Sequence, residues 1–138
     1  MTDFDLDRFL TAQERDFDKA RAEIAAGRKT THWIWYVYPQ LKGLGRSEPA
    51  QYYGLDGLAE AEAYMKHPVL GRRLVEMCEL LLTHADHPAE QILGTTDAMK
   101  VRSSATLFDR VSVAPDVFAR VLSTFYEGDP DPLTLERL

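Results

Sequence analysis

Apolar residues recur at intervals of three and four along most of this chain, which is the spacing of one face of an α-helix. The segments that show this spacing are 6–24, 56–66, 69–82, 98–108 and 117–125. Gly27 and Gly128 follow the first and the last of them, where glycine commonly ends a helix. The sequence therefore predicts an all-α fold, a compact single-domain bundle of about six to eight short helices.

The segment from His32 to Gln40, HWIWYVYPQ, has the β-branched and aromatic composition that is typical of a strand. Thr30 or Thr31 could equally cap a helix that Pro39 ends. A lone strand among helices would leave its backbone groups without partners. We therefore expect this segment to be helical or irregular.

Length and composition narrow the class of protein. The 138 residues are about the size of one domain, and no linker or repeat divides residues 1–138. Apolar residues make up 45% of the chain and charged residues 28%, without a long apolar run, which argues against a disordered chain and a membrane span. The first ten residues, MTDFDLDRFL, do not resemble a secretory signal, so we expect a cytoplasmic protein. The single Cys78 is expected to be a small buried thiol.

The net charge of −6 argues against an extended nucleic-acid surface, which would need clustered lysine and arginine. Two segments nevertheless contain no acidic residue, 24–47 and 98–108. In each segment, cationic side chains lie close in sequence to hydroxyl side chains. The candidate anion-binding residues are Arg46 and Ser47 in the first segment and Lys100, Arg102, Ser103 and Ser104 in the second. We expect the two segments to converge on one anion-binding cleft. In the alternative, the two arginines pair with acids, for which the candidates are Glu48, Asp97 and Asp109.

The hydroxyl residues of the second segment have two interpretations. Ser103, Ser104 and Thr106 lie within the predicted helix 98–108, where such side chains are mediocre because they compete for backbone hydrogen bonds. They could be donors to a phosphate or carboxylate, or small residues that let two helices pack closely.

The aromatic residues of 32–40 also have two interpretations. Trp33, Trp35 and Tyr36 could form the wall of a pocket for a planar ligand, while Gln40 reads an edge of that ligand and the amides of the adjacent GLG loop approach an anion. The alternative is an aromatic core. We expect Trp35, together with Phe108, to be a core residue in either case.

His32 is the candidate for acid–base chemistry, because a cap or an aromatic cage could hold its pKa near neutrality. His84 and His87 flank Asp86, but a single loop without a distant third ligand is a poor zinc site. No motif indicates a metal or a cofactor.

The runs GRKTTHWIWYVYPQLKGLGRSEPAQYYGL, AEAYMKHPVLGRRL and ILGTTDAMKVRSSATLF closely resemble the DUF1810 family of small bacterial and fungal proteins. The similarity extends from DLDRFLTAQ to VLSTFYEG. The resemblance implies an all-helical fold of one domain and brings no established activity. Some members carry the label "calpastatin", but calpastatins are disordered inhibitors, which the periodic, aromatic-rich pattern here contradicts.

Two functions follow as hypotheses. In the first, the chain binds a small, planar, anionic metabolite of nucleotide type between the HWIWYVYPQ/GLGRS segment and the KVRSS helix, with His32 in a catalytic role. In the second, it is a protein–protein interaction module or a homodimerising structural domain without catalytic activity. The sequence does not decide whether the chain is an enzyme.

Overall fold

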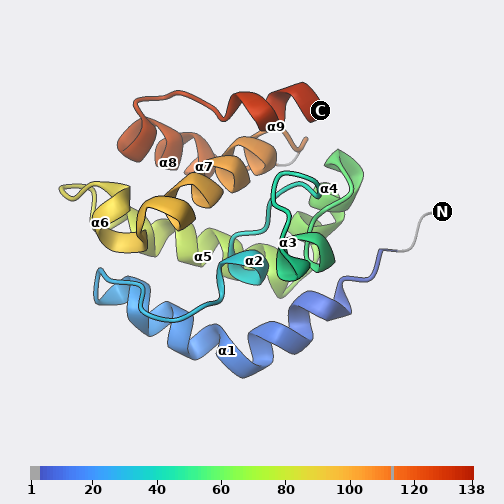
Figure 1. Cartoon of the computed structure of the whole chain (residues 1–138), viewed down its shortest axis with the longest axis horizontal. Coiled ribbons are helices and arrows are strands. Elements are labelled where there is room, and N and C mark those ends of the chain that lie inside the picture. The colour runs from blue at the N-terminus through green and yellow to red at the C-terminus, as the bar shows by residue number, and fades with distance from the viewer. Residues whose placement is uncertain (1–3, 113) are drawn as a thin grey trace.

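Nine helices follow one another in residues 4–112 and 114–138, the part of the chain that the computed structural model describes (Figure 1). They are α1 (Asp7–Ala25), α2 (Ile34–Val37), α3 (Glu48–Tyr52), α4 (Leu58–Lys66), α5 (Leu70–Leu82), α6 (Ala89–Leu93), α7 (Thr95–Asp109), α8 (Val117–Tyr126) and α9 (Pro132–Arg137). The predicted all-α class is confirmed. The helices outnumber the expected six to eight because several are only one or two turns long.

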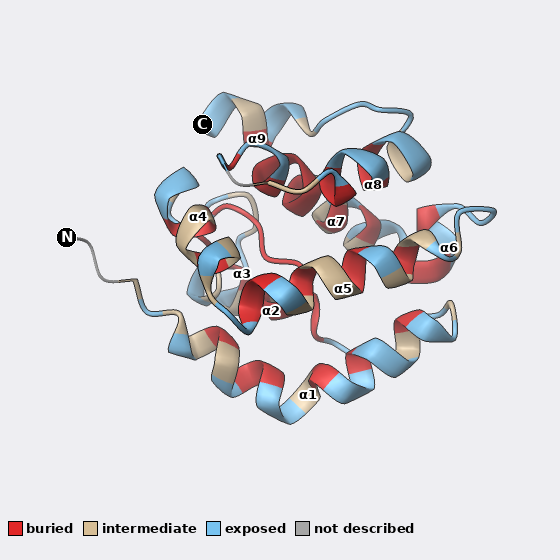
Figure 2. Ribbon diagram, turned by 180° about the vertical axis from the view of Figure 1, so that it is seen from behind, coloured by how far each residue is buried: buried red, intermediate tan, exposed pale blue. Residues whose placement is uncertain are grey.

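α5 lies in the middle of the fold, with α1 packed on one side and α8 on the other, and α7 packs in turn on α8 (Figure 1). α1 and α5 each bury one face, whereas all residues from Ser103 to Phe108 of α7 are buried (Figure 2). Phe108 of α7 is fully buried, as predicted, and stacks on Phe118 of α8 with 5.6 Å between ring centroids. Burial of such a side chain stabilises the fold by about 1.5–3 kcal/mol.

The aromatic segment forms one helical turn, α2, between irregular stretches, as predicted. Trp33, Tyr36 and Tyr38 are each at most 3% exposed, and the Tyr38 hydroxyl donates to the Met77 carbonyl oxygen at 2.8 Å. Burial raises the pKa of Tyr38 well above its ordinary value. Most of this segment is therefore part of the core, in agreement with the aromatic-core alternative.

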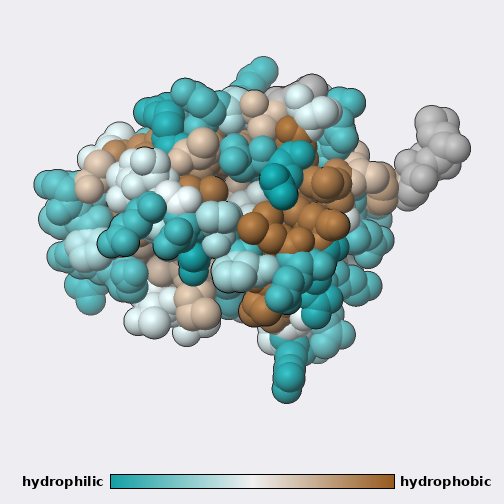
Figure 3. Space-filling view, turned by 90° about the horizontal axis from the view of Figure 1, so that it is seen from above, coloured by the Kyte–Doolittle hydropathy of each residue, from teal (hydrophilic) through white to brown (hydrophobic). Residues whose placement is uncertain are grey.

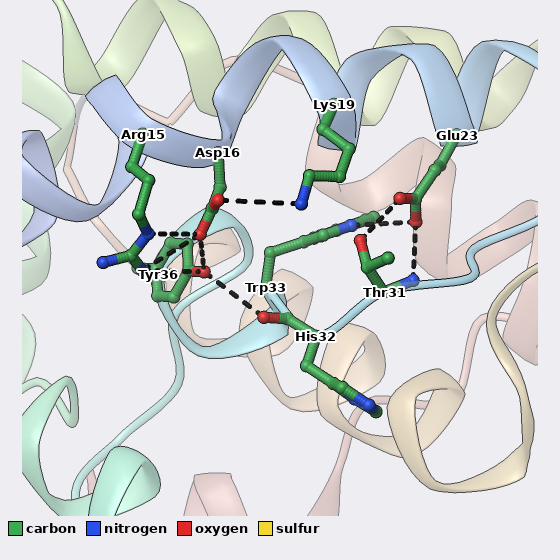
Figure 4. A network of polar contacts seen from close by, with 8 residues as sticks. All are labelled: Arg15, Asp16, Lys19, Glu23, Thr31, His32, Trp33 and Tyr36. Carbon is green, nitrogen blue, oxygen red and sulfur yellow. Dashed lines mark hydrogen bonds and ion pairs between the residues drawn. The ribbon is translucent and has the colours of Figure 1, made fainter.

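Two carboxylates of α1 hold the aromatic segment in place (Figure 4). Glu23 accepts hydrogen bonds from the Thr30 and Thr31 amides at 2.7 and 3.0 Å, and from the Trp33 indole nitrogen at 3.0 Å. Asp16 accepts a short hydrogen bond from the Tyr36 hydroxyl. Partial burial raises the pKa of Glu23, but the hydrogen bonds from Thr31, Thr30 and Trp33 outweigh that effect and lower the pKa to about 2.

The C-terminal tail, residues 129–138, docks on α7. The Arg102 guanidinium donates to the carbonyl oxygens of Asp129 at 2.9 Å and Pro130 at 3.1 Å. The Asp131 amide donates to the Thr106 hydroxyl at 2.8 Å. Asp131 is also the N-cap of α9, because its carboxylate accepts from the Thr134 amide at 3.0 Å. Side chains of α7 thus fix where the tail begins.

None of the helices in the described part of the chain is long and apolar enough to cross a membrane.

Candidate functional site

A pocket of about 200 Å³ lies between the loop that follows α2, the first turns of α7 and the start of α9. Three distant parts of the chain therefore meet there. The lining residues are Gln40, Leu44, Gly45, Thr96, Met99, Lys100, Arg102, Ser103, Asp131 and Leu133.

The loop wall of the pocket is held by backbone pairing. The Leu55 amide donates to the Gln40 carbonyl oxygen at 3.0 Å, and the Lys42 amide donates to the Leu55 carbonyl oxygen at 2.9 Å. The loop then passes close to α3, because a Cβ on Gly45 would lie only 2.7 Å from the Cβ of Ala50. The sequence places glycine where a larger residue would push the loop away from α3.

Gln40 is one of the two most buried polar residues of the pocket, and the other is Ser103. Gln40 is 7% exposed, and within residues 4–112 and 114–138 its side-chain amide has no hydrogen-bond partner. Neither amide atom is among the fully buried polar atoms of the described residues, so the Gln40 amide reaches the water of the pocket. The Gln40 side chain therefore has both donor and acceptor capacity available at the pocket wall.

Lys100 provides the available positive charge. Its ammonium lies 5.0 Å from the centre of the Trp35 ring and 3.4 Å from Oδ1 of Asp97. The other oxygen of Asp97 is 2.7 Å from the ammonium of Lys29, whose side chain is 5% exposed. Because Asp97 is shared and the Lys100 side chain is 22% exposed, Lys100 keeps donors for a further partner.

Arg102 and Ser103 also line the pocket but are already engaged. The Nε and Nη2 atoms of Arg102 bind the tail carbonyls. The Ser103 hydroxyl is 3.2 Å from the Met99 carbonyl oxygen and 3.1 Å from Oδ2 of Asp131. The main role of Arg102 is therefore structural. In the described residues it forms no ion pair with Asp97 or Asp109, the acids that the alternative interpretation named as its partners.

Asp131 contributes an acceptor to the pocket. Ser103 and both the amide and the hydroxyl of Thr134 donate to Oδ2. Across the described residues no donor reaches Oδ1. One carboxylate oxygen therefore fixes the tail and the other stays available at the pocket.

The predicted convergence of the two acid-free segments is found in part. Leu44 and Gly45 of the first segment face Lys100 and Ser103 of the second across the same pocket. Arg46 and Ser47 are exposed and do not line it. Ser47 instead caps α3 by accepting from the Ala50 amide at 3.3 Å. Within the described chain Arg46 is not paired with Glu48 either.

The aromatic residues proposed as a pocket wall do not line the pocket. Trp33 and Tyr36 are core residues whose polar atoms bind Glu23 and Asp16. Trp35, which was expected to be a core residue, is only partly buried and packs against the core from outside. It lies beneath Lys100, beside a narrow gap that it shares with Gln40. Its indole nitrogen is buried and has no partner in the described residues.

The remaining candidates also lie outside the pocket. Ser104 is 2% exposed, on a buried face of α7, as the helix-packing interpretation predicted. The His32 side chain is exposed and points away from the carboxylates of α1 (Figure 4), while its carbonyl oxygen accepts from the Tyr36 hydroxyl at 3.2 Å. No acid–base partner for His32 is found in the part of the chain that the structure describes.

Five residues that line the pocket were not predicted from the sequence: Asp131 and the uncharged Leu44, Thr96, Met99 and Leu133. The residues DP at 131–132 signal a helix cap, but nothing local to the tail indicates where that cap docks. No group of three or more potential metal-ligating side chains occurs within the described residues.

Comparison with known proteins addresses the family. A family model described as "Protein of unknown function (DUF1810)" matches residues 3–138. The chain belongs to the DUF1810 family. No match was found among proteins of curated function.

The fold of the DUF1810 chain is similar to that of a solved crystal structure. The crystal structure of the conserved hypothetical protein Rv1873 from Mycobacterium tuberculosis is similar to this chain with a TM-score of 0.95 and 42% sequence identity. The similarity covers 98% of this chain and 96% of that one. The whole fold described above is thus found in an experimental structure of a relative.

Proposed function

We propose that this DUF1810 chain binds a small molecule with an anionic group in the pocket between Gln40, Lys100 and Asp131. The observation that carries the proposal is the Gln40 amide, which lines the pocket without a protein partner although the residue is only 7% exposed. A ligand in the pocket can therefore hydrogen-bond to this amide without displacing a protein partner.

Charge favours an anion over a neutral molecule. Lys100 retains donors because it shares Asp97 with Lys29, and its contact with the Trp35 ring holds the ammonium beside the pocket. A carboxylate or a phosphate would form charge-assisted hydrogen bonds with it, which are about twice as strong as neutral ones.

The apolar lining favours an aliphatic body. Leu44, Met99 and Leu133 supply that lining, whereas the sequence had suggested aromatic walls around a planar, nucleotide-type ligand. A nucleobase could still pack on these side chains. No aromatic ring lines the pocket, however, so a nucleobase would gain no stacking energy over an aliphatic molecule. The nucleotide is therefore one member of the test panel.

The test measures the melting temperature of the chain with inorganic phosphate, 4-methylpentanoate and AMP. We expect at least one of them to raise the melting temperature with saturation. The variants Lys100→Met and Gln40→Leu should abolish that increase, and Lys66→Met, which removes an exposed lysine outside the pocket, should retain it. An equal increase in Lys100→Met and wild type would refute the proposal.

A second candidate is self-association through the pocket rim. Met99 and Leu133 are 67% and 59% exposed, and Figure 3 shows an apolar patch on the side of the molecule where α9 lies. Exposed apolar patches of this kind mark interaction surfaces. Light scattering would support this candidate if the wild type is a dimer and the double variant Met99→Ser, Leu133→Ser is a monomer.

A further inference from the structure

We infer that the ligand of this pocket is bipolar, with an anionic group for Lys100 and an N–H donor group for Asp131. The inference rests on the proposed function and names the ligand class of the same site. An aliphatic amino acid is the simplest molecule with these features.

The two oxygens of Asp131 have different surroundings. Oδ2 accepts from the Ser103 hydroxyl at 3.1 Å and from the amide and hydroxyl of Thr134 at 3.0 and 2.6 Å. These donors fix the rotamer of the carboxylate. Oδ1 has no donor among the described residues, although Asp131 lines the pocket.

An anion alone does not suit this arrangement. A ligand carboxylate that approaches Lys100 would enter a pocket that already holds the Asp131 carboxylate, and like charges at short range repel. An ammonium or amide N–H on the same ligand would reverse the sign of that interaction, because it donates to Oδ1. The Nε and Nη2 atoms of Arg102 bind the tail carbonyls, so these two donors are not available to Oδ1.

Gln40 fits a bipolar ligand for a separate reason. Its buried side chain offers both an N–H donor and a carbonyl acceptor, so it can pair with either end of the ligand. The aliphatic side chains of Leu44, Met99 and Leu133 complete a lining suited to a short branched body.

Three probes with one carbon skeleton test the inference. L-leucine carries both charged groups, 4-methylpentanoate carries only the anion and isoamylamine carries only the ammonium. Each is titrated into the full chain, with the backbone amide of Gly45 and the side-chain amide of Gln40 observed by NMR. We expect L-leucine to bind at least about tenfold more tightly than either of the other two, the value of one charge-assisted hydrogen bond.

The variant Asp131→Asn isolates the open oxygen. Asparagine is also a good N-cap, and its carbonyl oxygen can accept from Ser103 and Thr134 while its amide group replaces Oδ1. We expect the preference for L-leucine over 4-methylpentanoate to disappear in this variant. Asp129→Asn makes the same change of charge on an exposed side chain two residues away and should keep the preference. Protection of the α9 amides from hydrogen exchange verifies that the tail of each variant remains docked.

The outcomes separate this inference from the proposed function. If 4-methylpentanoate binds as tightly as L-leucine, or if Asp131→Asn keeps the preference, the ligand is an anion only and the bipolar inference is overturned while the anion pocket stands. If none of the three probes shifts the Gln40 or Gly45 signals, the inference is overturned, and the melting experiment with phosphate and AMP decides the proposed function alone.

Discussion

The indole nitrogen of Trp33 donates to the carboxylate of Glu23 at 3.0 Å, and this contact ties the aromatic segment to α1. The same carboxylate accepts from the amides of Thr30 and Thr31. Three residues of the stretch 30–33 therefore depend on one side chain of α1. Loss of that side chain leaves several donors without their acceptor.

The first prediction concerns the variant Glu23→Ala. It should lower the free energy of unfolding by about 2–3 kcal/mol, because hydrogen bonds to a charged acceptor are lost at a partly buried site. Urea denaturation measures the change. Glu14→Ala, which removes an exposed acid from the same helix, should change the free energy by less than about 0.5 kcal/mol. Equal effects of the two variants would show that the Glu23 contacts do not stabilise the fold.

The second prediction is the pH dependence of the same contact. The pKa of Glu23 is lowered from 4.5 to about 2 by the hydrogen bonds that it accepts, so the unfolded chain binds a proton there more readily than the folded chain. The stabilisation from Glu23 is present above about pH 4.5 and is lost as the pH falls toward 2. The difference in stability between wild type and Glu23→Gln, measured by urea denaturation, should shrink between pH 6 and pH 3 (about 10³-fold in proton concentration). A constant difference would contradict the lowered pKa.

The third prediction compares the two tryptophans. The Trp33 indole nitrogen is bonded to Glu23, whereas that of Trp35 is buried without a partner in the described residues. Trp33→Phe should therefore cost about 1–2 kcal/mol more than Trp35→Phe, because only the first removes a hydrogen bond. Denaturation of both variants in one buffer measures the difference. A larger cost for Trp35→Phe would mean that its nitrogen has a partner in solution.

The fourth prediction concerns Arg102. The Arg102 guanidinium binds the carbonyl oxygens of Asp129 and Pro130, so the variant Arg102→Ala removes two contacts of the tail. We expect the variant to loosen the tail, with faster hydrogen exchange of the Asp131 and Thr134 amides and a melting temperature lower by several degrees. Arg110→Ala, at an exposed site, should change neither. Unaltered exchange in Arg102→Ala would show that the tail docks without this residue.

Much of the fold could be predicted because its signals are local. Ser47 caps α3 and Pro49 lies in its first turn, and a capping serine followed by proline is a local signal of a helix start. The helical turn at 34–37 was also predicted, because a lone strand would have had no partner. The carboxylates Asp16 and Glu23 could not be assigned, since an acid on a predicted helix gives no sign that it faces a segment many residues away.

The candidate site was predicted less completely. Lys100 and Ser103 were proposed as a cation and a hydroxyl in the acid-free segment 98–108, and both line the pocket. Arg46 was proposed for the same reason but is exposed and does not line the pocket, and it lies in the irregular stretch between Gly45 and the cap at Ser47. Asp131 was missed because its role depends on long-range docking of the tail on α7.

The fifth prediction tests the anion pocket most directly. It is an NMR titration of the chain with the anion that most raises its melting temperature, observed at the side-chain amide of Gln40. We predict that this signal, the Gly45 amide and the Met99 methyl group shift together with one dissociation constant. Lys100→Met should weaken that constant at least about tenfold, the loss of one charge-assisted contact, and Lys66→Met should not. A Gln40 signal that stays in place while other signals move, or equal binding by Lys100→Met, would contradict the account.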